Sequence, residues 1–116
     1  MLRDILRASL ANEPDMTLVG EAADLGETVR LVERRSVDVV VLGLNGGELS
    51  PLHYRLFDVD ARLSILAVEA LGQSASLYEL APRRQVFRGR SAKELMQVIR
   101  EQVRSRHARA ALGAQD

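Results

Sequence analysis

The sequence predicts an α/β fold in which helices cover both faces of a parallel sheet. Segments with apolar residues at helical spacing alternate along the chain with short runs rich in valine, isoleucine and leucine. The run Asp38-Val39-Val40-Val41-Leu42 is continuous and β-branched, as is typical of a strand that is buried on both faces. Together, the alternation and this buried strand favour a doubly wound parallel sheet.

The first half of the chain is expected to hold two helices and two strands. The first helix is indicated by apolar residues at helical spacing, which are Leu2, Ile5, Leu6 and Leu10. It should end before Pro14, and a strand should follow over residues 17–22. Asp24 stands three residues before Glu27, a pattern typical of a capping box, so a second helix is expected from there to about Arg35. The valine-rich run 38–42 should be the central strand.

The second half continues the alternation after a loop over residues 43–48. Ser50 followed by Pro51 predicts the start of a short helix over 52–57. A strand is expected over 63–68, a short helix over 77–80 that Pro82 ends, and a strand over 85–87. A second capping pair, Ser91 and Glu94, opens a last helix that runs to about Arg109. We therefore expect four strands and about five helices in one domain over residues 1–109, with a flexible tail over 110–116.

Composition narrows the class of protein. The chain has 116 residues, enough for one core, and no cysteine, which excludes disulfides and thiolate metal sites. No apolar run is long enough for a membrane span and no signal peptide is recognisable, so a cytoplasmic protein is expected. The zero net charge hides an uneven distribution: residues 1–82 carry 7 basic and 13 acidic side chains, and residues 83–109 carry 9 and 2. The C-terminal quarter is therefore basic.

Three segments resemble a known family. Glu13-Pro14-Asp15, Val19-Gly20-Glu21-Ala22 and the run 38–42 are similar to receiver domains of response regulators, of the class usually joined to a helix-turn-helix output domain. The resemblance covers about residues 2–105 and implies a flavodoxin-like sheet of strand order 2-1-3-4-5. This chain begins in the first helix, so the fold should be truncated at the N-terminus. The loss of the family's first strand should leave an unpaired edge or force its neighbours to pair directly, unless another chain fills the gap.

The resemblance also implies a phosphorylation site that this chain has lost. Receivers use an aspartate after the third strand as phosphoacceptor, acids after the first strand to hold a divalent cation, and a hydroxyl and a lysine to sense the phosphoryl group. Here Gly43 replaces the acceptor, Glu69 the hydroxyl and Arg88 the lysine, and only Asn45 fits the pattern. Without a carboxylate there is no nucleophile, and without cation and lysine the phosphoryl charge is unscreened. We expect no enzyme activity, no metal and no cofactor.

Alternative readings of the polar residues stay open. Glu69 and Arg88 would form an ion pair across adjacent strand ends that mimics the switched-on state, or an ordinary surface pair. Substitute phosphoacceptors would be Asp38, Asp58 or Asp60, which are better explained as carboxylates of strand starts and loops. Neither histidine has a catalytic partner motif, and the glycines at 43, 46 and 47 lack the rest of a phosphate-binding loop.

The last helix carries one further pattern. Polar and basic residues share a stripe on it, which consists of Lys93, Gln97, Arg100, Arg104 and His107. We interpret this stripe as a partner-binding face of a phosphorylation-independent interaction module, which forms a homodimer or docks on another signalling protein. A nucleic-acid-linked regulator is the alternative function, and a merely solvated face is the simplest explanation.

Overall fold

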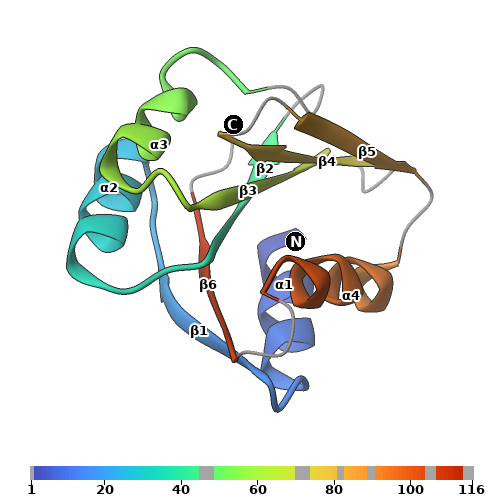
Figure 1. Ribbon diagram of the computed structural model, residues 1–116. Coiled ribbons are helices and arrows are strands. Elements are labelled where there is room, and N and C mark those ends of the chain that lie inside the picture. Colours follow the sequence, from blue (N-terminus) through green and yellow to red (C-terminus); the bar gives the residue numbers. More distant parts are fainter. Residues whose placement is uncertain are drawn as a thin grey trace.

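The computed structural model describes residues 2–44, 49–69, 74–80, 83–88, 91–103 and 107–113. In these ranges six strands form one sheet in the order β1-β6-β2-β3-β4-β5 (Figure 1). Strands β1 and β2 are parallel to β6, β2 is parallel to β3, and β4 is antiparallel to both of its neighbours. The strand bounds are β1 Met16–Glu21, β2 Val39–Leu44, β3 Ser64–Glu69, β4 Ser74–Glu79, β5 Arg83–Arg88 and β6 Ala108–Leu112. The sheet is therefore mostly parallel.

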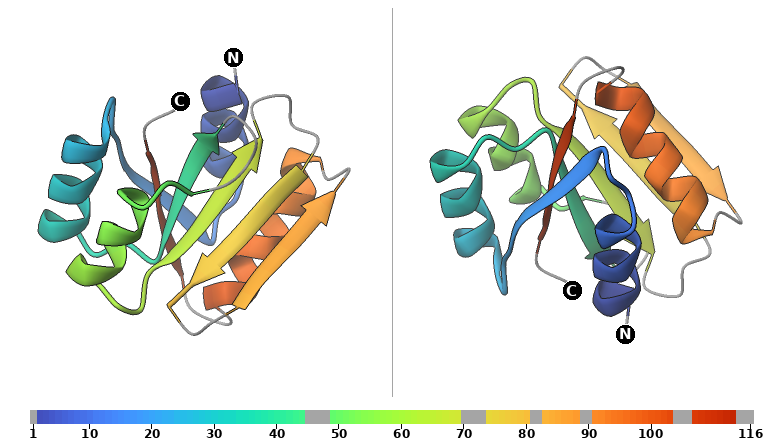
Figure 2. Two further views of the ribbon diagram at one scale, coloured as in Figure 1. Left: turned by 90° about the horizontal axis from the view of Figure 1, so that it is seen from above. Right: turned by 90° about the horizontal axis from the view of Figure 1, so that it is seen from below.

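Helices cover this sheet on both faces, which confirms the α/β class. The described helices are α1 Leu2–Ala11, α2 Leu25–Arg34, the 3-10 turn η2 His53–Arg55, α3 Leu56–Val59 and α4 Ala92–Val103. Helices α1 and α4 lie on one face of the sheet and α2 and α3 on the other (Figure 2). Each face has its own core. Leu6, Leu10, Met96 and Ile99 pack with Val39 and Val41 on the first, and Val32, Leu56 and Phe57 with Val40 and Leu42 on the second. No helix in the described ranges has the length and apolar character that a membrane crossing requires.

Both predicted capping boxes are confirmed. At the start of α2, the Glu27 N–H donates to Asp24 Oδ1 at 2.8 Å, and the Ala23 N–H donates to Glu27 Oε2 at 3.0 Å. At the start of α4, the Ser91 N–H donates to Glu94 Oε1 at 3.0 Å, and the Glu94 N–H donates to Ser91 Oγ at 3.2 Å. Each box satisfies backbone donors that have no partner within the helix, so local sequence fixes where both helices begin.

The short helix predicted over residues 77–80 is wrong, because Ser74–Glu79 form strand β4. Ala75 and Leu77 join the core under α4, whereas Tyr78 joins the core under α3. This alternation is the strand period, and antiparallel pairing with β3 and β5 supplies the backbone hydrogen bonds. The four residues Leu77-Tyr78-Glu79-Leu80 are too few for their pattern to distinguish a strand from a helix, and a single helical turn is costly to nucleate.

The predicted extent of the last helix is also wrong. Helix α4 ends at Val103, and Ala108–Leu112 form strand β6, so residues 110–112 belong to the sheet rather than to a flexible tail. Three of the five residues of β6 are alanine, which favours helix over strand, so the local sequence does not indicate a strand here. The sheet overrides that propensity because β6 finds backbone partners in β1 on one side and β2 on the other. Ala110 and Ala111 are fully buried between these neighbours.

Strand β6 lies where the receiver resemblance expects a gap. The sheet has neither an unpaired edge between β1 and β2 nor direct pairing of the two, because β6 is inserted between them (Figure 1). A segment of the same chain, and no second chain, fills this position. The predicted total of four strands was therefore too low, because β4 was predicted in part as a short helix and β6 as the end of a helix followed by a flexible tail.

An acidic side chain within β6 should unfold the protein. We expect Ala110→Asp to lower the free energy of unfolding by about 3 kcal/mol or more, because a carboxylate would be buried without a partner. Urea denaturation measures this effect. Arg109→Gln is the matched control, since Arg109 is exposed on the same strand, and should change the free energy by about 0.5 kcal/mol or less. Equal stability of both variants would contradict the central position of β6.

Candidate functional site

The carboxyl ends of parallel strands meet at one edge of this sheet, where ligands of open α/β folds bind. Strand β1 ends there at Glu21, β2 at Leu44, β3 at Glu69 and β6 at Leu112. We call this region the carboxyl edge. The predicted receiver positions Gly43 and Glu69 both belong to it.

Gly43 lies within strand β2, opposite Val68 of β3, and not in a loop as the sequence suggested. It borders a cavity of about 10 Å³ together with Arg3, Leu6 and Gly113. A cavity of this size holds one water molecule at most. Gly43 brings no functional group to the carboxyl edge, so this position offers no nucleophile.

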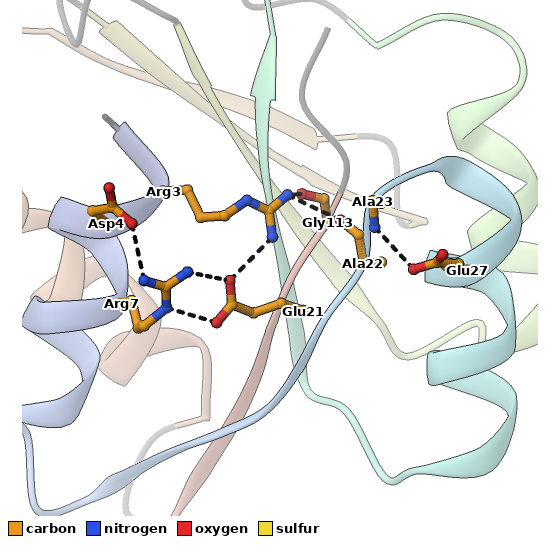
Figure 3. A network of polar contacts seen from close by, with 8 residues as sticks. All are labelled: Arg3, Asp4, Arg7, Glu21, Ala22, Ala23, Glu27 and Gly113. Atoms are coloured by element: carbon orange, nitrogen blue, oxygen red, sulfur yellow. Dashed lines mark hydrogen bonds and ion pairs between the residues drawn. The ribbon is translucent and has the colours of Figure 1, made fainter.

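Glu21 is held at the carboxyl edge by two arginines of α1 (Figure 3). Arg7 binds both carboxylate oxygens, with Nε 2.7 Å from Oε2 and Nη2 2.8 Å from Oε1. Arg3 Nη1 adds a contact of 3.3 Å to Oε1. These hydrogen bonds, led by those from Arg7, lower the pKa of Glu21 from 4.5 to about 2, and Glu21 in turn raises the pKa of Arg7 above its usual value. Glu21 is therefore an ionised structural partner.

Arg3 also binds the backbone at the ends of two strands. Its Nη2 donates to the carbonyl oxygen of Ala22 at 2.9 Å and to that of Gly113 at 2.7 Å (Figure 3). These carbonyls follow β1 and β6, so one guanidinium joins α1 to both strands. The prediction did not include Arg3, Arg7 or Glu21. The four-residue spacing of the two arginines on one helix face was the available signal.

Glu69 and Arg88 do not lie on adjacent strands, which corrects the predicted ion pair across adjacent strand ends. Strand β4 stands between β3 and β5, and its Ser74 pairs in register with Arg88. Ser74 Oγ donates to Glu69 Oε2 at 2.8 Å. The side chain of Arg88 and the whole of Asn45 lie outside the described residues.

The predicted basic face of the last helix is divided by the structure. Lys93 and Gln97 are exposed on α4, and Arg104 lies outside the described residues. His107 is not on the helix: it precedes β6, and its Nε2 contacts Thr17 Oγ1. Helix α4 ends at Val103, so a stripe that includes His107 does not form.

Arg100 has the most hydrogen-bond partners among the described residues of that stripe, and two of these partners are acidic. Its Nε and Nη2 donate to the two carboxylate oxygens of Asp15 at 2.6 and 2.9 Å, and Nη2 also contacts Glu13. Gln97 Oε1 accepts a further hydrogen bond at 2.8 Å. The hydrogen bonds to Arg100 lower the pKa of Asp15, and those to Asp15 and then Glu13 raise the pKa of Arg100. This cluster joins α4 to the turn before β1.

Three of the remaining candidate residues have structural partners, and the fourth borders a groove. Asp38 Oδ2 accepts from the Arg109 N–H at 2.9 Å, and Asp60 Oδ1 accepts from the Arg62 N–H at 2.9 Å. His53 Nδ1 accepts from the Ser50 N–H at 3.1 Å. Asp58 borders an open groove between α2 and α3. Within the described ranges, no three acidic or histidine side chains form a group that could hold a metal ion.

Comparisons with protein-family models, with curated proteins and with solved structures each find no match to this chain. No family is assigned.

The Glu21 ion pairs should make stability depend on pH in acid. Because the folded state lowers the pKa of Glu21, its contribution is complete above the ordinary value of 4.5 and is lost as the pH falls towards about 2. We expect Glu21→Gln to be about 1 kcal/mol less stable than the unmodified chain near neutral pH, with a difference that disappears across this interval. Urea denaturation at several pH values measures it. Glu33→Gln, an exposed site on α2, is the control and should show no such trend.

The contacts of Arg100 should contribute more to the free energy of unfolding than those of the exposed Lys93 on the same helix. We expect Arg100→Gln to lower the free energy of unfolding by about 1 kcal/mol, because Asp15 and Glu13 lose their shared cation. Lys93→Gln on the same helix should cost about 0.5 kcal/mol or less, since Lys93 is exposed. The midpoints of urea denaturation of both variants measure these two losses of stability. An equal cost at the two sites would contradict a specific role for Arg100.

Proposed function

We propose that this chain is a phosphorylation-independent, receiver-like interaction module of signal transduction or transcriptional regulation. The observation that supports it most directly is the carboxyl edge, where a receiver would hold its phosphoacceptor. Gly43 supplies no carboxylate there, Glu21 is neutralised by Arg3 and Arg7, and Glu69 accepts from Ser74. The described part of this edge thus serves the structure and offers no phosphoryl chemistry.

The sheet order also supports a flavodoxin-like ancestry. Strands β1, β6, β2 and β3 lie in the spatial sequence that a 2-1-3-4 arrangement would have, with β6 in the place of the family's first strand. The departure is β4, an antiparallel strand that stands between β3 and β5, whereas strands 4 and 5 of that family are neighbours. In receivers, the segment between the fourth and fifth strands moves on phosphorylation. A receiver in which this segment has become a strand would have no use for that movement.

The proposed partner is another protein. A homodimer was expected on two grounds, the missing strand and the basic face of the last helix. Strand β6 supplies the missing strand from the same chain, which removes the first ground. The reason to consider nucleic acid was the basic stripe of the last helix. In the described residues its Arg100 is paired with two carboxylates and His107 stands apart from it. A second protein is the partner that the remaining surface favours.

Treatment with acetyl phosphate and Mg²⁺ tests the loss of phosphorylation. We expect the intact mass of the chain to stay unchanged, because no described carboxylate is both free and supported by a cation site. A receiver that retains its phosphoacceptor aspartate serves as the positive control in the same reaction. A hydroxylamine-sensitive adduct with the mass of one phosphoryl group on this chain would overturn the proposal.

Light scattering across a dilution series tests the choice of partner. We expect the mass of one chain, 12.8 kDa, at every concentration, because the sheet is complete within a single molecule. The Ala110→Asp variant, in which β6 is disturbed, should instead associate as its strands become exposed. A concentration-independent dimer of the unmodified chain would contradict the proposed hetero-partner.

A further inference from the structure

Strand β5 forms one edge of the sheet. It pairs with β4 from Ser74 opposite Arg88 to Glu79 opposite Arg83, and no strand of the described residues lies on its other side. Such an edge presents backbone N–H and C=O groups that can pair with a further strand. Natural proteins usually protect long edges by charge, by bulges or by cover.

The charge on this edge has one sign. The six residues of β5, Arg-Arg-Gln-Val-Phe-Arg, contain three arginines and no acidic residue. Pairing of two copies about the strand centre would place Arg83 opposite Arg88 twice, and like charges directly opposite one another destabilise a sheet. Pairing with a second copy is therefore disfavoured, whereas pairing with an acidic segment is favoured.

The face of the sheet beside this edge is exposed at one residue of β5. Helix α4 covers the face that contains Ala75 and Leu77 (Figure 2). On the opposite face Ser76 and Tyr78 of β4 are buried, and Tyr78 belongs to the core under α3. Val86 lies on this second face, because it pairs in register with Ser76. Its side chain is 44% exposed, and Leu80 at the adjoining turn is 56% exposed. Apolar side chains of an added strand would find contacts here.

We propose that β5 is a docking edge for an extended acidic segment of a partner protein, which adds to the sheet as a further strand. This inference rests on the proposed function, because it names the partner chemistry of the interaction module. Backbone hydrogen bonds would align the segment with β5. Arg84, Val86 and Arg88 share one face of the strand, because they pair in register with Tyr78, Ser76 and Ser74. The segment should therefore carry an acidic, an apolar and an acidic residue at every second position.

A labelled synthetic peptide with the core Glu-Thr-Val-Thr-Glu, which places glutamate, valine and glutamate on one face, tests the proposal by fluorescence anisotropy. We expect saturable binding that weakens as salt is added. Two further peptides carry N-methyl groups, one on the odd-numbered and one on the even-numbered amides. Only one edge of an added strand faces β5, so one of them should lose about tenfold or more in affinity and the other should bind as the parent does.

Charge reversal on the strand gives the matched test within the protein. We expect Arg84→Glu with Arg88→Glu to weaken peptide binding by about tenfold or more. Arg62→Glu is the control, because the Arg62 side chain is 94% exposed in a loop remote from β5 in the chain, and it should leave binding unchanged. Circular dichroism establishes that each variant is folded, and the N-methyl peptides test the proposal without any variant.

Three results would overturn the docking edge: no binding of the parent peptide, equal binding of both N-methyl peptides, or tighter binding of a labelled DNA duplex than of the peptide. The second result would indicate adsorption by charge alone, and the third a surface for nucleic acid. If the peptide fails while acetyl phosphate leaves the chain unmodified, only the docking edge is wrong. If the chain is phosphorylated, the proposed function fails whatever the peptide does.

Discussion

The architecture depends on the insertion of β6 between two strands that lie far from it in the sequence. Its ends are fixed by backbone hydrogen bonds on both sides, from the Ala108 N–H to the Asp15 carbonyl at 2.9 Å and from the Gly113 N–H to the Val41 carbonyl at 2.7 Å. Small side chains make the fit close, because a Cβ at Gly113 would come within 2.2 Å of Leu42 Cδ2. Without β6, β1 would have no strand partner in the described sheet.

This insertion also determines what the carboxyl edge can do. It brings the carbonyl oxygen of Gly113 to the guanidinium of Arg3, which already holds Glu21 and the carbonyl of Ala22. The polar groups at this edge are thereby used to bind α1 to β1 and β6. A site that must bind and release a phosphoryl group requires free carboxylates with a cation between them. Among the described residues of this edge, Glu21 and Glu69 are both held by structural partners.

The sequence predicted the elements whose signals are local and missed those that depend on distant partners. The capping boxes at Asp24 and Ser91 and the valine-rich strand β2 were found correctly, because each is encoded within a few residues. Strand β4 was predicted in part as a short helix, and strand β6 as the end of a helix followed by a flexible tail, because neither segment has a clear strand pattern of its own and both depend on sheet partners. At the site, the absence of a carboxylate at Gly43 was visible in the sequence. The Arg3–Glu21 and Arg100–Asp15 pairs span 18 and 85 residues and required the fold.

The most direct test of this account is the hydrogen exchange of the backbone amides in β6, measured residue by residue by NMR. An inserted central strand should exchange only when the whole domain unfolds, so the amides of Ala110 and Ala111 should be as protected as those of Val40 and Val41 in β2. That result would establish β6 as part of the core sheet. Rapid exchange of residues 108–112, with β2 still protected, would contradict the account, because the segment would then be a tail and the sheet would lack the strand that completes it.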